Sequence, residues 1–316
     1  MSYNIVEYLR KLSVENLFAT NTFSGAWNVW KDEINKYASN KTANQILNLG
    51  DNLANIFRST SSAGRTQSDV AGGGNAWESL TCWYLNLCLI GRRTIVIKHH
   101  KGLIPDPVSD AITVNYSNFV SNTESDLIAI TFPDEEEYKK NIDEIDIEDI
   151  NGNKVQIYNG QKTNYKEIIN ALCTRDFQKL EIHVIQCKTN WNDNAQIPML
   201  WNMVYAANDF KENNISIGRN GYSIHDIKKF TYSFVTVPTV RLESFKANST
   251  AVKRVINLSG GNYWGYPTKS GIANSIKEML SRNLASGAET NHLNTLREEL
   301  NKLNDDYSYF KINNNA

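Results

Sequence analysis

The chain has 316 residues, of which 41% are hydrophobic and 21% charged, and its formal net charge at pH 7 is -1. This length can bury a sizeable core in one large domain or two modest ones, and the composition is typical of a soluble globular protein. No run approaches the roughly 18 apolar residues of a membrane span, and the first residues lack the features of a signal peptide. We therefore expect a cytoplasmic protein without a membrane-spanning helix.

The net charge conceals an acidic segment. Residues 134–149 contain nine acidic residues and two lysines, a net charge of -7, so the rest of the chain carries -1 minus -7, or +6. A mildly basic body with one acidic segment is compatible with local binding of a polyanion. The same distribution also fits a protein with a solvated acidic loop and no nucleic-acid partner.

The first part of the chain is expected to be helical, because apolar side chains recur at helical spacing between residues 3 and 58. A polar, Gly/Ser-rich stretch over 59–75 then predicts a flexible connection. The next expected helix, over 76–90, is apolar on most sides and should be buried. It contains Cys82 and Cys88, which, like Cys173 and Cys187 further on, show no CxxC pairing and are interpreted as buried free thiols rather than disulfides or zinc ligands.

The middle of the chain alternates between strand and helix patterns. Short helices are expected over 165–172 and 196–209, the second with Pro198 in its first turn. This alternation predicts an α/β fold with a central mixed β-sheet flanked by helices and preceded by the N-terminal helical region. The strands are expected over 94–98, 112–116, 126–132, 154–158, 180–188 and 230–237.

The C-terminal part is expected to be largely helical. A Gly/aromatic turn over 260–267 precedes helical patterns near 271–285 and 289–303. The tail from Asn304 onward is polar and is expected to fray.

The strongest functional signal is a β-branched, apolar strand that ends in Gln186-Cys187-Lys188. Because strand side chains alternate between faces, Gln186 and Lys188 are predicted to share one face. A lysine at the end of such a strand is costly to bury without an anionic partner. Upstream, Asp126 begins another apolar strand, and a carboxylate there suits Mg²⁺, which prefers oxygen ligands. Taken singly, a turn-capping aspartate or an exposed strand-end lysine would also explain these residues.

Together these residues resemble the PD-(D/E)xK nuclease superfamily, and within it the type II restriction endonucleases that carry Gln where most members have Glu. The polar turn over 189–194 and the helix after it strengthen the resemblance, because in these enzymes a turn and a helix follow the motif lysine. The resemblance implies a restriction-endonuclease-like core over 71–240, with an acidic insertion near 133–179. An N-terminal helical region, 1–70, would precede it, and a C-terminal helical extension, 241–316, would follow.

The resemblance also implies a mechanism, in which a Mg²⁺-activated water hydrolyses a phosphodiester of double-stranded DNA. Asp126, Gln186 and the backbone carbonyl of Cys187 would bind the ion. Glu78, on the helix before the first of these strands, would supply a further carboxylate. Lys188 would orient the water and stabilise the transition state.

The partners implied are a short palindromic DNA site, a second copy of the chain in a homodimer of matching symmetry, and a cognate DNA methyltransferase in a prokaryotic cytoplasm. Contacts to DNA are expected from polar and basic residues that follow the motif. Each is more often a phosphate contact or a solvated charge than a base reader. These residues are Asn190, Asn192, Arg219, Arg241, Lys246, Lys253, Arg254 and Lys269.

The sequence departs from the family pattern in two respects. A serine, not a proline, precedes Asp126, while Asp106 and Asp134 do follow prolines and are interpreted as decoys. Asp110, before another strand pattern, is a weaker competitor. The 60 positions between Asp126 and Gln186 exceed what a hairpin needs, which is why an insertion is inferred.

Other chemistries have less support. His99 and His100 lack the partner residues of a His-metal nuclease, and His183 is predicted to lie on the face opposite Gln186. The glycines at 72–74 lack the Gly-Lys-Ser/Thr ending of a P-loop. Two alternatives to a type II enzyme stay open. One is a nuclease of the same superfamily that acts in repair, junction resolution or modification-dependent cutting, and the other is a non-catalytic DNA-binding protein of the same fold.

Overall fold

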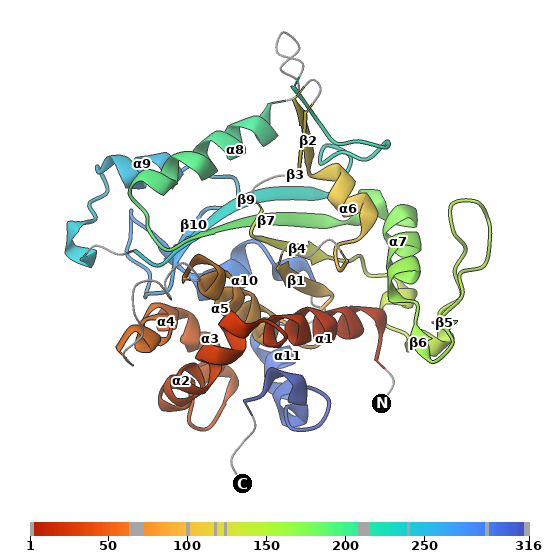
Figure 1. Cartoon of the computed structure of the whole chain (residues 1–316), viewed down its shortest axis with the longest axis horizontal. Helices are drawn as coiled ribbons and strands as arrows, with labels where there is room; N and C mark the ends of the chain where they lie inside the picture. Colours follow the sequence, from red (N-terminus) through yellow and green to blue (C-terminus); the bar gives the residue numbers. More distant parts are fainter. Residues whose placement is uncertain are drawn as a thin grey trace.

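A mixed β-sheet lies at the centre of the molecule, between two layers of helices (Figure 1). Its strands follow the order β1-β4-β7-β9-β10-β11; β1, β4 and β7 pair antiparallel, and β7, β9, β10 and β11 pair parallel. The computed structural model describes residues 3–62, 73–98, 102–116, 119–122, 125–207, 215–238, 241–287 and 291–312, and within them six strands form this sheet. They are β1 (Thr94–Lys98), β4 (Leu127–Thr131), β7 (Glu181–Lys188), β9 (Lys229–Thr236), β10 (Asn262–Trp264) and β11 (Asn274–Ser275).

The central strands form because their β-branched, apolar runs are covered on both faces. In β7 every residue except Lys188 is buried, and all of β4 is buried. Strands that are covered on both sides have nearly continuous apolar sequences rather than alternating ones. The predicted α/β fold, with a mixed sheet, flanking helices and an N-terminal helical region, is therefore confirmed at this level.

Each face of the sheet has its own hydrophobic core. The first core joins the N-terminal helices and the long buried helix α5 to the C-terminal part of the chain. The second core lies under α6, α7 and α8 and also receives the first turns of α1. The helices are α1 (Ile5–Phe18), α2 (Asn21–Tyr37), α3 (Ala43–Asn48), α4 (Leu53–Ser62), α5 (Gly73–Cys88), α6 (Asp106–Ala111), α7 (Tyr165–Arg175), α8 (Gln196–Ala206), α9 (Thr250–Val255), α10 (Met279–Arg282) and α11 (His292–Glu299).

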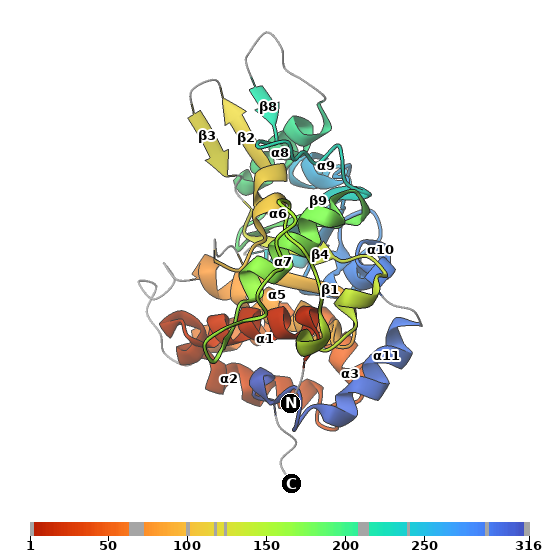
Figure 2. The same ribbon diagram turned by 90° about the vertical axis from the view of Figure 1, so that its right-hand side faces the viewer.

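Two smaller sheets lie outside the central one in the described residues. An antiparallel sheet of β2, β3 and β8 lies at the end of the molecule farthest from both termini (Figure 2). A two-stranded hairpin, β5 and β6, follows the acidic segment, whose isoleucines are buried in the second core while most of its carboxylates face outward. These strands are β2 (Thr113–Tyr116), β3 (Phe119–Asn122), β8 (Ile215–Ile217), β5 (Tyr158–Asn159) and β6 (Lys162–Thr163).

The structure corrects several expectations. Of the strand expected over 154–158, only Tyr158 lies in a strand, as the first residue of the two-residue β5. The Gly/aromatic turn contains strand β10, and most of 271–285 is β11 and short helical turns rather than one helix. Up to Ile312, where the described residues end, the C-terminal tail does not fray, because Tyr307, Phe310 and Ile312 are buried in the first core. In the sequence these apolar residues are interspersed with polar ones, so the segment was predicted to be exposed.

All four cysteines lie in described parts of the chain, and each is a buried free thiol, as predicted. In the part of the chain that the structure covers, no helix is long and apolar enough to cross a bilayer.

Candidate functional site

Charged side chains converge at one end of the central sheet, where β1 and β7 end and β4 begins. The strand register places Lys98 opposite Leu127, and Leu127 opposite Ile185. Asp126, one residue before β4, therefore lies between the end of β1, at Lys98, and the end of β7, at Lys188. Helix α5 crosses the same end of the sheet and contributes Glu78.

Asp126 contacts two consecutive residues of β7. Its Oδ2 accepts a hydrogen bond of 2.7 Å from the backbone N–H of Cys187, and the same oxygen lies 3.8 Å from Nζ of Lys188. The side chains of Asp126 and Lys188 are 18% and 24% exposed, so the pair is partly buried but open to a solute. The structure thus brings together the aspartate and the lysine that the sequence singled out.

The end of β7 is held in place by its other neighbour, β9. The carbonyl of Lys188 accepts a hydrogen bond of 2.9 Å from Oγ1 of Thr236 and one of 3.2 Å from the N–H of Val237. The N–H and C=O of one strand residue point toward the same neighbouring strand. Since the N–H of Cys187 points to Asp126, its carbonyl oxygen also faces that side, which is the orientation a metal ligand there needs.

Glu78 belongs to the same electrostatic group. Burial raises the pKa of the Glu78 carboxyl, the negative charge of Asp126 raises it further, and Lys98 and Lys188 act in the opposite direction. The charge of Asp126 thus disfavours ionisation of Glu78, so the two carboxylates belong to one electrostatic environment. A cation placed between them would relieve that repulsion.

Lys98 is a residue of this cluster that the sequence analysis missed. Its Nζ lies 3.4 Å from Oε2 of Glu78 and donates hydrogen bonds to the carbonyl of Asn75, at 3.0 Å, to the Asn75 side-chain oxygen, and to Oγ of Ser79, at 2.9 Å. The signal was present, because Lys98 ends an apolar, β-branched strand in the same way as Lys188 does.

Gln186 has a different environment. Its side chain is fully buried, and its Oε1 accepts a hydrogen bond of 2.5 Å from the hydroxyl of Tyr232 on β9. The hydroxyl fixes the amide in the second core. A role for Gln186 as a metal ligand stays a prediction.

The cluster suits a hydrated Mg²⁺ better than a metal caged by protein ligands. Among the described residues, no group of three or more His, Cys, Asp and Glu side chains could hold a metal ion. The cluster offers two carboxylates, Glu78 and Asp126, together with the carbonyl of Cys187. Mg²⁺ usually keeps several waters and takes one or two protein carboxylates, so this oxygen-only set fits that ion. It does not fit the four-ligand cage of structural zinc.

The other aspartates that compete with Asp126 have partners elsewhere. Asp106 lies 3.0 Å from Nζ of Lys166, on α7. Asp134 follows the opposite end of β4 and pairs with Lys139 at 2.5 Å. Asp110 is a separate case: its carboxylate accepts from Nε of Arg219 at 2.5 Å and from the side-chain amide of Asn220 at 2.9 Å.

The residues predicted to touch DNA are dispersed. Arg219 pairs with Asp110, as described above. Asn190 belongs to the turn after Lys188, in which its side-chain oxygen accepts from the N–H of Asn192 at 3.3 Å. Lys269 donates to the carbonyl of Leu242 at 3.2 Å. The remaining four lie between β9 and β10; three are exposed, Arg241, Lys246 and Lys253, and Arg254 is half-buried.

His183 is not part of the cluster. This residue is buried, and its Nδ1 lies 2.7 Å from Oγ1 of Thr231. His99 and His100 lie outside the described residues, as does Gly72, the first of the three consecutive glycines.

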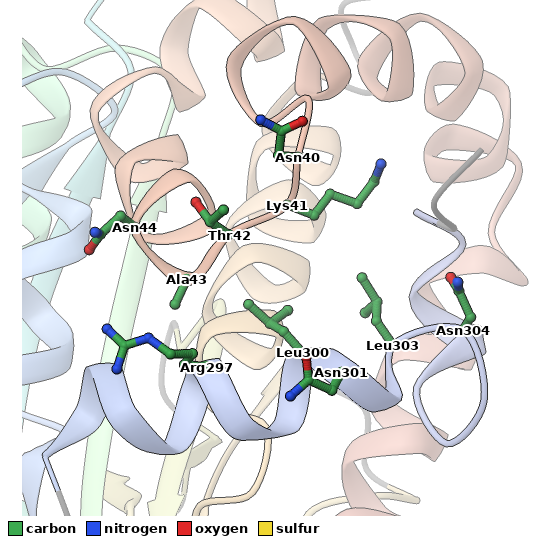
Figure 3. Close-up of a pocket in the computed structure, with 10 residues that line it drawn as sticks. All are labelled: Asn40, Lys41, Thr42, Ala43, Asn44, Arg297, Leu300, Asn301, Leu303 and Asn304. Carbon is green, nitrogen blue, oxygen red and sulfur yellow. The ribbon is translucent and has the colours of Figure 1, made fainter. Parts of the chain in front are cut away.

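A pocket of about 420 Å³ lies between the turn before α3 and helix α11 (Figure 3). The described residues that line it include Lys41, Arg297 and several asparagines but no acid. This pocket therefore offers no carboxylate to a metal, and it shares no residue with the cluster at the strand ends.

No protein-family model and no curated protein sequence matches this chain. The functional argument therefore depends on the geometry of the cluster.

Proposed function

We propose that the protein is a Mg²⁺-dependent endonuclease that hydrolyses phosphodiester bonds in double-stranded DNA at a specific site, as type II restriction enzymes do. The observation that carries this proposal is the contact of Asp126 with both Cys187 and Lys188 beside a second carboxylate, Glu78. A purely structural ion pair would not need two carboxylates that repel each other in a partly buried position.

Each residue has a distinct part in the proposed mechanism. Asp126, Glu78 and the carbonyl of Cys187 would hold Mg²⁺, with Gln186 a further candidate ligand. The ion, when bound, lowers the pKa of its water and neutralises charge on the scissile phosphate. Lys188 lies beside Asp126, so its ammonium group can donate a hydrogen bond to the attacking water or to a phosphate oxygen.

The finer assignment to a restriction-endonuclease-like core is supported by the order of parts along the chain. A helix with Glu78 comes first, then a strand preceded by Asp126, then a strand ending in Lys188, a polar turn and helix α8. Homodimerisation, a palindromic DNA site, a partner methyltransferase and a prokaryotic cytoplasm are part of the same proposal and depend on this resemblance.

The test is incubation of the purified protein with unmethylated phage DNA, with and without Mg²⁺, beside Lys188→Ala. We expect discrete Mg²⁺-dependent bands, and a loss of about 10²-fold or more in rate for the variant, the usual contribution of a group that assists proton transfer. Lys228→Ala is the matched control, because Lys228 also pairs with an acid of the sheet, Glu181 at 2.8 Å, but at the opposite end of β7.

Other results would select the alternatives. A smear that depends on Mg²⁺ and Lys188 would indicate a less selective nuclease of the same superfamily. DNA binding without cutting under any divalent ion would indicate a non-catalytic DNA-binding protein. If the protein neither bound nor cut DNA, the proposal would be overturned.

A further inference from the structure

Without a metal, the cluster is electrically balanced. Among the described residues it brings together two carboxylates, Glu78 and Asp126, and two ammonium groups, Lys98 and Lys188, in the pairs Lys98–Glu78 and Lys188–Asp126. Their formal charges sum to zero. The side chains of the first pair are 17% and 19% exposed, so water screens this pair only partly.

Lys98 is fixed by contacts that do not depend on Glu78. An ammonium group has three hydrogens to donate. Those of Lys98 point to two oxygens of Asn75 and to the hydroxyl of Ser79, all of them neutral groups in the first two turns of α5. If the Glu78 carboxylate turned toward a metal, Lys98 would therefore keep its place and lose the anionic partner that it has among the described residues.

We propose that Lys98 is a built-in counter-ion, which competes with the divalent cation for Glu78 and thereby couples binding of the cation to binding of a phosphodiester. This inference rests on the proposed nuclease function. A bound dication would change the formal charge of the cluster from zero to +2. The phosphodiester, with a charge of -1, would offset part of that excess and replace Glu78 as the anion near Lys98.

The coupling has to be reciprocal. If a phosphodiester strengthens cation binding by some factor, the cation strengthens phosphodiester binding by the same factor. The free protein should then hold the cation weakly, and the site should be fully loaded only when DNA is present.

The test measures Ca²⁺ binding to the full chain by titration calorimetry, with and without a short mixed-sequence DNA duplex that a gel shows to stay intact. In the absence of DNA, we expect Lys98→Met to bind Ca²⁺ about fivefold more tightly than the wild type, because a partly screened ion pair no longer competes. The duplex should tighten Ca²⁺ binding to the wild type by about fivefold or more, and to Lys98→Met by a clearly smaller factor.

Two further variants control this experiment. Lys98→Arg keeps the charge and should resemble the wild type, and Lys228→Met removes an ion pair at the other end of β7 and should also leave Ca²⁺ binding unchanged. Equal or weaker Ca²⁺ binding by Lys98→Met, with wild-type folding by circular dichroism, would overturn the counter-ion role and leave the nuclease proposal standing. No difference between the wild type and Asp126→Asn would instead overturn the metal site itself.

Discussion

Asp126 is positioned by the backbone of the strand beside it. The N–H of Cys187 donates to its Oδ2 at 2.7 Å, so the carboxylate is fixed by a rigid, buried strand and not only by a flexible lysine. A hydrogen bond to an ionised acceptor is stronger than one between neutral groups. If the proposed cation binds here, it would therefore meet a carboxylate that the strand already holds in position.

The contribution of Gln186 to stability can be tested by a single substitution. Gln186→Met should lower the free energy of unfolding by about 1–3 kcal/mol, because it removes the buried hydrogen bond from Tyr232. Urea denaturation measures this loss. In the double variant with Tyr232→Phe the two losses should not add, and simple additivity would show that the pair is not coupled.

The same variant tests the proposed metal ligand. Unchanged Ca²⁺ binding by Gln186→Met would remove this residue from the ligand set.

At the scale of elements, β7 is the strand on which the site depends. It pairs antiparallel with β4 from Glu181 to Ile185 and parallel with β9 along its whole length. The strand carries His183 inside the sheet, and burial lowers the pKa of this histidine to about 3, with a smaller contribution from Lys229. Acid should therefore weaken the element that presents Lys188.

The sign of the pH effect follows from proton binding. Between the unfolded pKa of about 6.5 and the folded pKa, the unfolded state binds a proton at His183 that the folded state does not, so stability falls as pH falls. Between about pH 6.5 and about pH 4, this proton uptake should lower the unfolding free energy of the wild type by about 1.4 kcal/mol for each unit that the pH falls. His183→Val should lack this contribution, so its unfolding free energy should fall less steeply. Denaturation curves at several pH values give the slope, and equal slopes in both proteins would contradict this expectation.

A strand could be predicted from the sequence where its own residues form an apolar, β-branched run. The runs at 94–98 and 180–188 are apolar and β-branched, and the structure has strands there within one residue. The ion pair of Lys98 with Glu78 depends instead on where α5 crosses β1, which no local pattern specifies. Likewise, Tyr232 reaches Gln186 only because β9 adopts one particular parallel register with β7.

At the scale of the whole molecule, distant parts of the chain share the first core. Nε1 of Trp83, on α5, donates to the carbonyl of Phe310 at 3.2 Å, and the hydroxyl of Tyr3 donates to the carbonyl of Asp306 at 2.9 Å. The C-terminal residues therefore support α5, the helix that presents Glu78 to the site.

This support can be measured. Phe310→Ala should lower the unfolding free energy by about 3–5 kcal/mol, because it leaves a cavity against Trp83 in the core. The neighbouring exposed residue provides the control, since Ser308→Ala should change stability by less than about 0.5 kcal/mol. A loss for Phe310→Ala as small as that of the control would show that the C-terminal segment does not stabilise the core.

The contact between Tyr3 and Asp306 also bears on synthesis, since it spans 303 positions of the chain. A ribosome adds roughly 5–20 residues per second, so α5 must wait on the order of ten seconds or more before its C-terminal support emerges. During that interval α5, which carries Glu78, lacks the packing contacts of the C-terminal residues. A nascent chain would therefore complete the proposed cation site, and with it any power to cut DNA, only after Phe310 has been synthesised.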